Sequence, residues 1–327
     1  MKIKKLKPIP CPHMKTGFSK SNSSKFMLGS LALATVLPLA GSNARADETN
    51  SVAATPPPPP PSRVNALVDL TIASHYLTPR GMDVSSQGVV FQPLVLAFFN
   101  VYKADKSDGF INDATIVGGF WNCFGTHQLP ATQDAGSNKT GWYEIDPIAG
   151  ISIGFAKNFK VSVTYTAFNM QILDIPFSQH LESKVSFDDS DYLKAFALHP
   201  YFLYWQELDG KAVSNTDANP SSSHYFEVGI APGYTFKDFY NIKLEAPCRV
   251  LMAADAFYGT AAGTTTFVSL YEIGLKASAP LPFMPQGYGH WSANLGVKYM
   301  NFDNPNIEAT QHESGATMVY GGISCFF

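Results

Sequence analysis

The sequence predicts an all-β fold, a closed antiparallel transmembrane β-barrel of about twelve strands. The main observation is a two-residue alternation of apolar and polar side chains in runs of about 10–16 residues, separated by turn-rich segments. Composition agrees, because only 15% of the 327 residues are charged while Tyr (15) and Phe (24) are abundant. A mean hydropathy of −0.03 argues against several apolar membrane helices, each of which needs about 20 residues.

Residues 1–46 are predicted to be a signal peptide. They hold 8 of the 23 Lys and Arg residues and no acidic residue, and an apolar run over 26–40 precedes Ala44-Arg45-Ala46. A signal peptidase cleaves after such a small-x-small pattern, so we expect the mature protein to start at Asp47. An organelle transit peptide is the alternative interpretation of this basic, acid-free segment.

Residues 47–62 predict a periplasmic spacer, because the six prolines from Pro56 to Pro61 favour a semi-rigid polyproline II segment. One barrel domain is then expected over 63–327. After residue 46 the chain keeps 15 basic residues against all 26 acidic ones, a net charge of −11. A chain this acidic is not expected to bind nucleic acid, whose phosphates need a basic surface.

The alternation delimits the strands. In the clearest run, Phe159 and Val161 fall on one face while Lys160 and Ser162 fall on the other. Twelve candidate strands cover residues 66–79, 88–103, 113–124, 142–156, 158–169, 179–188, 192–206, 223–236, 241–253, 266–279, 288–302 and 316–327. The connections alternate between mostly short and long, as in bacterial outer-membrane barrels with short periplasmic turns and longer outer loops. A soluble β-sandwich is the alternative, although its strands average about 5–6 residues.

The last strand ends on an aromatic residue. Val319, Ile323, Cys325 and Phe327 form an alternating stripe that resembles the C-terminal assembly signal of outer-membrane β-barrel proteins. The resemblance implies a bacterial outer-membrane location in a Gram-negative cell. It also implies outer-membrane lipid, lipopolysaccharide and the barrel assembly machinery as partners, with Phe327 as part of the assembly signal.

A second resemblance lies near the first strand. Ser74-His75-Tyr76-Leu77-Thr78-Pro79-Arg80-Gly81, followed by Val90-Phe91-Gln92-Pro93, is similar to the opening of the TorF-type porins, with one residue inserted before Arg80. It covers about thirty residues and implies a porin without naming a solute.

Catalytic and metal motifs are weak. Gly150-Ile151-Ser152-Ile153-Gly154 matches the G-x-S-x-G pattern, but a nucleophile elbow needs a strand-to-helix turn, and this motif falls inside a predicted strand. The acidic run 188–191 could bind Ca²⁺, yet we expect a solvated turn there. No Cys or His ligand spacing is present. We therefore expect no cofactor, no metal and no enzyme activity.

Aromatic residues near strand ends are expected to form interfacial girdles, in which rings lie at the level of the lipid headgroups. The residues concerned are Trp121, Trp142, Tyr143, Trp205, Tyr258 and Tyr288.

The inward face is expected to carry the function. By alternation it collects six acidic and five basic side chains, which must face water or one another because burial in lipid is costly. They are Asp69, Glu144, Asp146, Lys160, Glu227, Lys243, Glu245, Arg249, Glu272, Lys276 and Lys298. They would line a charged constriction or pack into a plug.

A passive, porin-like channel for small hydrophilic solutes is the function we expect. The predicted outer loops hold Arg80, two lysines and ten acidic residues, so weak cation selectivity should follow. Two alternatives remain: a barrel hydrolase acting on lipid through Ser152, and a non-conducting structural or adhesion barrel that presents the loops 207–222 and 303–315.

Overall fold

The computed structural model describes most of the chain after residue 62. The described residues are 63–85, 87–104, 109–127, 141–171, 177–209, 223–254, 257–258, 266–311 and 313–327. The predicted signal peptide, its cleavage site and the proline-rich spacer lie outside these ranges.

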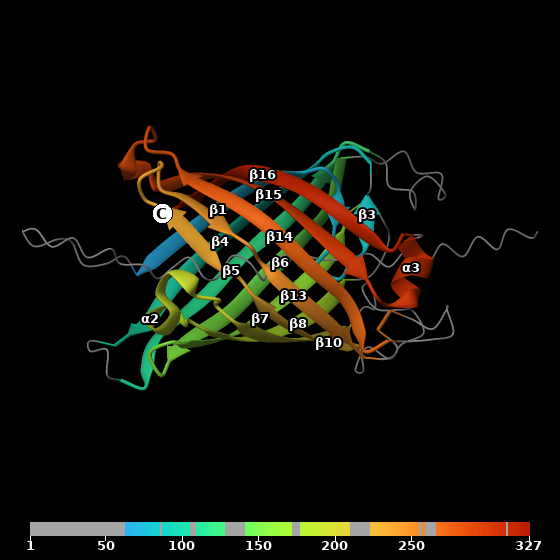
Figure 1. The fold of residues 1–327 in the computed structure, drawn as a ribbon, viewed down its shortest axis with the longest axis horizontal. Coiled ribbons are helices and arrows are strands. Elements are labelled where there is room, and N and C mark those ends of the chain that lie inside the picture. The colour runs from blue at the N-terminus through green and yellow to red at the C-terminus, as the bar shows by residue number, and fades with distance from the viewer. Residues whose placement is uncertain are drawn as a thin grey trace, which may run out of the picture.

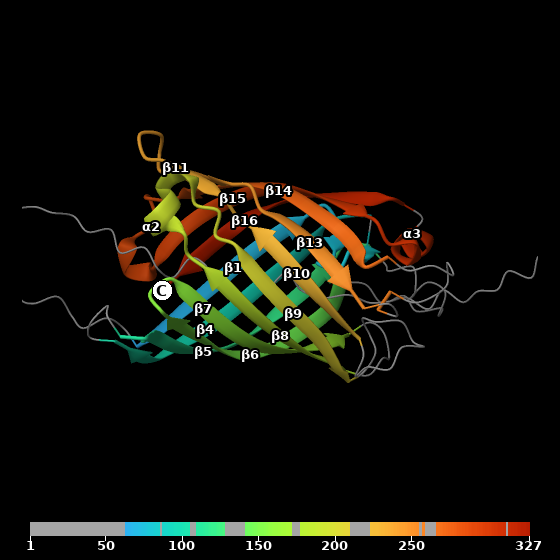
Figure 2. The ribbon, with the colours of Figure 1, turned by 60° about the horizontal axis from the view of Figure 1, so that its bottom comes forward.

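Twelve antiparallel strands close into one barrel (Figure 1, Figure 2). In order around the ring they are β1 (Val64–Ala73), β4 (Val90–Lys103), β5 (Ile111–Gly125), β6 (Gly141–Phe155), β7 (Phe159–Met170), β8 (Ser178–Phe187), β9 (Tyr201–Asp209), β10 (His224–Ile230), β13 (Cys248–Ala253), β14 (Val268–Pro280), β15 (His290–Phe302) and β16 (Gly315–Phe326). The first and last strands pair directly, with Leu67 opposite Phe326. This closure satisfies the backbone of both edges, which lipid requires. The predicted fold class is confirmed.

The polarity of the barrel wall is reversed relative to a soluble protein. In β7, Ser162 and Thr164 are buried, whereas large apolar side chains are exposed along most strands. These exposed side chains include Leu70, Ile72, Phe99, Ile116, Phe120, Ile151, Phe202, Val228, Tyr271, Ile273, Leu275, Leu295 and Val297. An apolar exterior around a polar interior is the arrangement that lipid selects in barrels.

The connections alternate as predicted. The C-terminus and α2 (Ser190–Leu193) lie at one end of the barrel, and α3 (Pro305–Gln311) lies at the other (Figure 1). Short turns at the first end include 156–158 and 237–241, while the connection between β1 and β4 at the opposite end spans 74–89. By analogy with other barrels, the end with short turns faces the periplasm. No helix of the described ranges is long and apolar enough to span a membrane.

Two prolines interrupt neighbouring strands near the periplasmic end. β10 resumes after Pro232 as β11 (Gly233–Phe236), and β12 (Ile242–Glu245) leads through Pro247 into β13. A proline has no N–H group to give to a ladder, so it occurs at such breaks. β11 and β12 pair with each other, and β12 also pairs with β14, so this hairpin extends the wall.

The predicted strand 192–206 is wrong in its first half. Residues 190–196 instead form α2 and the 3₁₀ turn η3 (Lys194–Phe196), and β9 begins at Tyr201. Lys194 and His199 adopt positive φ angles of 52° and 48°, which a strand does not allow. The Asp189 carboxylate accepts the N–H groups of residues 198 and 199, which closes this turn, and alternation of polarity carries no information on such bonds.

The predicted strand 66–79 is also too long. β1 ends at Ala73, and the chain then forms a hairpin of β2 (Tyr76–Leu77) and β3 (Asp83–Ser85). Gly81 donates its N–H to the Thr78 carbonyl at 3.0 Å and has a φ angle of 82°, which favours glycine. The reversal of chain direction between β2 and β3 therefore depends on the turn at Gly81. We call residues 74–89 the plug segment.

Candidate functional site

The plug segment crosses the interior of the barrel. On one side, the Tyr76 ring lies 5.5 Å from the ring of Trp121 in β5. On the other side, Nη2 of Arg249 in β13 donates to the Pro79 carbonyl at 2.6 Å. Strands β5 and β13 lie on opposite sides of the ring, separated by the same number of strands in either direction. The segment therefore bridges two opposite walls.

Gly81 fits this crossing closely. A Cβ atom at Gly81 would lie 2.8 Å from the ring of Phe302 in β15 and 3.1 Å from the side chain of Leu270 in β14. Both contacts are tighter than side chains normally allow, so only glycine fits between these strands and the hairpin.

Arg80, at the tip of the plug segment, is the largest fully buried side chain of the described residues, with 2% of its surface exposed. Its guanidinium carbon lies 5.2 Å from the ring centre of Phe168 and 5.0 Å from that of Trp205. The Tyr258 hydroxyl donates to the Arg80 carbonyl at 2.9 Å. The expectation that Arg80 belongs to an outer loop in solvent is therefore wrong, because the turn directs it inward.

The expected aromatic girdle is mostly wrong for the same reason. Trp121, Tyr143, Trp205 and Tyr258 are at most 6% exposed. They belong to an apolar core that fills the outer half of the barrel against the plug segment. Only Trp142 and Tyr288, at 41% and 68% exposure, keep the accessibility that a girdle residue needs.

A buried charged network occupies the wall beneath the plug. Arg249 forms an ion pair with Glu227, and its Nη2 lies 2.8 Å from Glu272. Lys298 lies 3.8 Å from the same Glu272 carboxylate, and the Tyr201 hydroxyl donates to Glu227 at 2.6 Å. Opposite charges therefore neutralise one another across β10, β13, β14 and β15, which is necessary for burial. The alternation predicted the four charged members of this network.

The remaining predicted residues are distributed over the rest of the wall. Glu144 and Asp146 are buried on β6, and Glu144 accepts a hydrogen bond from Tyr76 of the plug. Asp69 accepts hydrogen bonds from Thr71 and Ser324, and it takes no part in the charged network.

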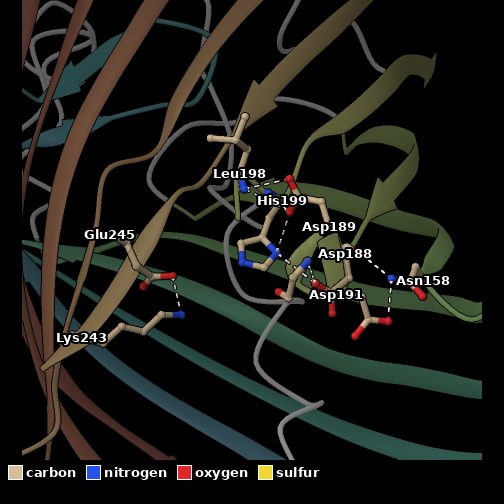
Figure 3. Close-up of polar contacts among 9 residues, drawn as sticks. Asn158, Asp188, Asp189, Asp191, Leu198, His199, Lys243 and Glu245 are labelled. Atoms are coloured by element: carbon tan, nitrogen blue, oxygen red, sulfur yellow. Dashed lines mark hydrogen bonds and ion pairs between the residues drawn. The ribbon is translucent and has the colours of Figure 1, made fainter. Parts of the chain in front are cut away.

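Three of the four predicted lysines lie outside that network too. Lys243 lies 2.8 Å from Glu245 within β12, and both are close to the periplasmic turn (Figure 3). Lys160 and Lys276 are partly buried.

Sequence reasoning missed three interior residues on β8. The His180 ring lies between those of Phe168 and Trp205, tilted against the first and stacked on the second, with ring-centre distances of 3.8 and 4.6 Å. Lys184 is buried and places its Nζ 4.1 Å from the ring centre of Tyr201. Glu182 lies between them on the same face. These three residues occupy every second position of the predicted strand 179–188, so the alternation of the sequence already placed them on one face of that strand.

Among the described residues, neither Ser152 nor Ser178 has the partners of a catalytic triad. Ser152 lies in mid-strand on β6, opposite Thr115 and Ser162, and no helix follows its motif. The Ser178 hydroxyl lies 2.8 Å from Nε2 of His180, but it also lies 3.0 Å from Glu207. A triad needs the carboxylate on the other ring nitrogen of the histidine.

The acidic run forms the periplasmic turn before β9 (Figure 3). Asp188, Asp189 and His199 bring potential ligand atoms within 4.8 Å of one another. However, Asp189 already accepts backbone N–H groups from residues 198 and 199. Burial alone would raise the pKa of Asp189, but these N–H groups stabilise the ionised carboxylate and hold its pKa below the ordinary value. Asp189 therefore has a structural role in closing the turn.

No protein-family model and no curated protein matches the sequence. Among solved structures, outer membrane phospholipase A from Escherichia coli is similar over 80% of this chain and 89% of that chain, with 13% identity and a TM-score of 0.41. The outer membrane channel DcaP of Acinetobacter baumannii is similar over 81% and 96%, with 10% identity and a TM-score of 0.35. The translocator domain of the autotransporter NalP from Neisseria meningitidis is similar over 82% and 90%, with 10% identity and a TM-score of 0.33.

The closed ring, its apolar exterior and its alternating connections are the architecture by which bacterial proteins span the outer membrane. This chain is a bacterial outer-membrane β-barrel.

Proposed function

We propose that this barrel is a passive channel for small hydrophilic solutes and that the plug segment closes it. The observation that carries the proposal is a charged interior beneath a hairpin that is not part of the wall. All twelve strands pair around the ring without β2 and β3. Displacement of the hairpin would therefore leave the wall closed and the charged network facing water.

The size of the ring supports this proposal. Side chains fill a barrel of eight strands, whereas sixteen or more strands leave an aqueous channel. A twelve-strand ring lies between these limits, so part of its interior must be filled by something other than wall side chains. The plug segment supplies this filling at the outer end. A barrel with a purely structural role would not need ionisable groups on β6, β8, β10, β13, β14 and β15.

Conductance of the full-length protein refolded into planar lipid bilayers tests the proposal. The parent should show rare openings, and a variant with residues 76–85 replaced by a Gly-Ser linker of equal length should conduct continuously. Arg63→Ala is the matched control, because Arg63 is exposed at the opposite end of the barrel. An absence of conductance from the folded linker variant would contradict the channel and favour a structural or adhesion barrel.

Weak cation selectivity is the second part of the proposal. Of the ten acidic residues in the predicted outer loops, Glu207 is instead buried on β9 and Asp83 lies in the plug segment, and of the three basic residues Arg80 lies inside the barrel, so eight acidic residues and two lysines remain in the count. The cation preference should decrease as the Debye length falls from about 8 Å at physiological salt to about 3 Å at 1 M. Glu308→Gln together with Glu313→Gln should also reduce it. A reversal potential with clear anion preference would contradict the charge argument.

A further inference from the structure

The environment of the Arg80 guanidinium is unusual. Its Nε and Nη2 atoms are buried and have no hydrogen-bond partner within the described residues. Burial of a charge that lacks hydrogen bonds is costly unless the surroundings neutralise it. The contacts that the guanidinium does make are with the rings of Phe168 and Trp205. The wall therefore holds this cation by aromatic faces and by charge, without directed hydrogen bonds to Nε and Nη2.

Three acidic side chains contribute to the electrostatic environment of Arg80, namely Glu144 and Asp146 on β6 and Glu182 on β8. None of the ion pairs among the described residues involves Arg80 itself. Glu144 and Asp146 are at most 1% exposed. These acids belong to the wall, whereas Arg80 belongs to the plug segment. Removal of the plug would leave an acidic patch beside two aromatic rings in the interior, with the His180 imidazole still lying between those rings.

Aromatic faces beside carboxylates are a suitable environment for organic cations. A ring face attracts a guanidinium or ammonium group within about 6 Å, most strongly where water is excluded. The ring of Tyr225 extends the aromatic surface, since it stacks on Trp205 at 5.1 Å. Phe257 meets Trp205 edge-on at 5.6 Å. The rings are therefore held in place by one another.

We propose that Phe168, Trp205, Glu144, Asp146 and Glu182 form a binding site for small organic cations that carry a guanidinium or amino group, and that Arg80 occupies it as a tethered competitor. This inference rests on the proposed channel function, because a solute reaches the site only when the plug segment leaves. It assigns the solute class of that channel, and it makes the closed state a competition between Arg80 and the solute.

Methylguanidinium is the probe for this site, and N-methylurea is its neutral control of similar shape. Binding is measured by isothermal titration calorimetry on the refolded full-length protein. Arg80→Ala should bind methylguanidinium saturably, at least about tenfold more tightly than the parent, in which Arg80 fills the site. Neither protein should bind N-methylurea. Arg63→Ala should behave as the parent. Adding Glu182→Gln to Arg80→Ala should weaken binding about tenfold, which corresponds to about 1.4 kcal/mol.

The outcomes separate the site from the channel. Saturable binding to Arg80→Ala without conductance would support the site and contradict the channel. Conductance without selective binding of methylguanidinium would overturn the site and leave the channel. Equal affinities of parent and Arg80→Ala would also overturn it. If Arg80→Ala does not fold, Arg80→Gln removes the charge but keeps an unbranched polar side chain, and the same calorimetric titration of this variant tests the site.

Discussion

Asp189 illustrates how one buried carboxylate replaces the strand that alternation predicts. It accepts two bonds at 3.0 and 2.9 Å from the N–H of Leu198 and one at 2.9 Å from that of His199. The chain then returns to the wall, where Ala231 donates its N–H to the Leu198 carbonyl at 2.7 Å. The Asp189 side chain thus closes the turn 188–200, and the backbone of Leu198 joins this turn to the start of the break between β10 and β11.

Asp189→Ala should lower the free energy of unfolding by about 1–3 kcal/mol, because buried N–H groups lose a charged acceptor. A carboxyl with a lowered folded pKa stabilises the fold above its ordinary pKa and loses this contribution as pH falls through the folded pKa. The difference between variant and parent should therefore shrink below about pH 4. Urea unfolding of refolded protein at pH 7 and pH 3 measures both effects.

Asp191→Ala is the control for this experiment. Asp191 lies two residues further and pairs with Lys157 at 2.6 Å, but both side chains are more than half exposed. An exposed pair contributes about 0–1 kcal/mol. Equal losses for the two variants would contradict the role assigned to Asp189.

At the scale of elements, the plug hairpin carries its own titratable group. Burial, and then the nearby Glu313, raise the pKa of Asp83 to about 6. We call the hairpin seated when it lies inside the barrel. The raised pKa means that protonation of Asp83 favours the seated hairpin, so its stability should increase as pH falls from about 6 to about 4 and decrease as pH rises. His75 acts in the opposite direction. Burial and then Lys298 lower its pKa, so protonation of the imidazole in the displaced hairpin opposes seating as pH falls below about 6.5, over the same range, but the pKa shift of Asp83 is the larger of the two.

The hairpin should therefore exchange its backbone amides more slowly at pH 5 than at pH 7.5, after correction for the intrinsic rate. Asp83→Asn should give slow exchange at both pH values, because the amide does not ionise. Hydrogen exchange of the peptide covering 76–85 measures this without relying on conductance. Faster corrected exchange at pH 5 in the parent would show that another group controls the seating.

The elements also show what sequence can predict. All twelve wall strands follow from alternation, because a barrel wall has one lipid face and one interior face along its whole length. Alternation also placed Glu227, Arg249, Glu272 and Lys298 on the interior. It failed at residues 74–79 and 190–196, where a glycine turn and a carboxylate bonded to the backbone redirect the chain. Alternation also could not show that Trp205 lies under the plug and not in a girdle, because the burial of Trp205 depends on the plug segment, which is far away in sequence.

At the scale of the whole molecule, closure depends on the pairing of β1 with β16. Phe327 donates its N–H to the Ala66 carbonyl at 2.9 Å and accepts the Ala66 N–H at 3.4 Å. Its neighbour Phe326 faces Phe98 of β4 with ring centres 6.3 Å apart. The terminal residue therefore completes the last contact of the ring, while its own side chain remains 51% exposed.

Deletion of Phe327 separates a folded-state role from an assembly role. The folded barrel loses two backbone hydrogen bonds, each contributing about 0.5–1.5 kcal/mol, and little apolar burial. Such a loss leaves most molecules folded. If Phe327 is also part of the assembly signal, the amount of heat-modifiable, protease-resistant barrel in the outer membrane should fall several-fold in cells, whereas refolding into lipid should change little. Phe110→Ala is the control, since it removes a Phe side chain that is 73% exposed in a turn. Equal amounts of barrel from the deletion and from Phe110→Ala would contradict the assembly role.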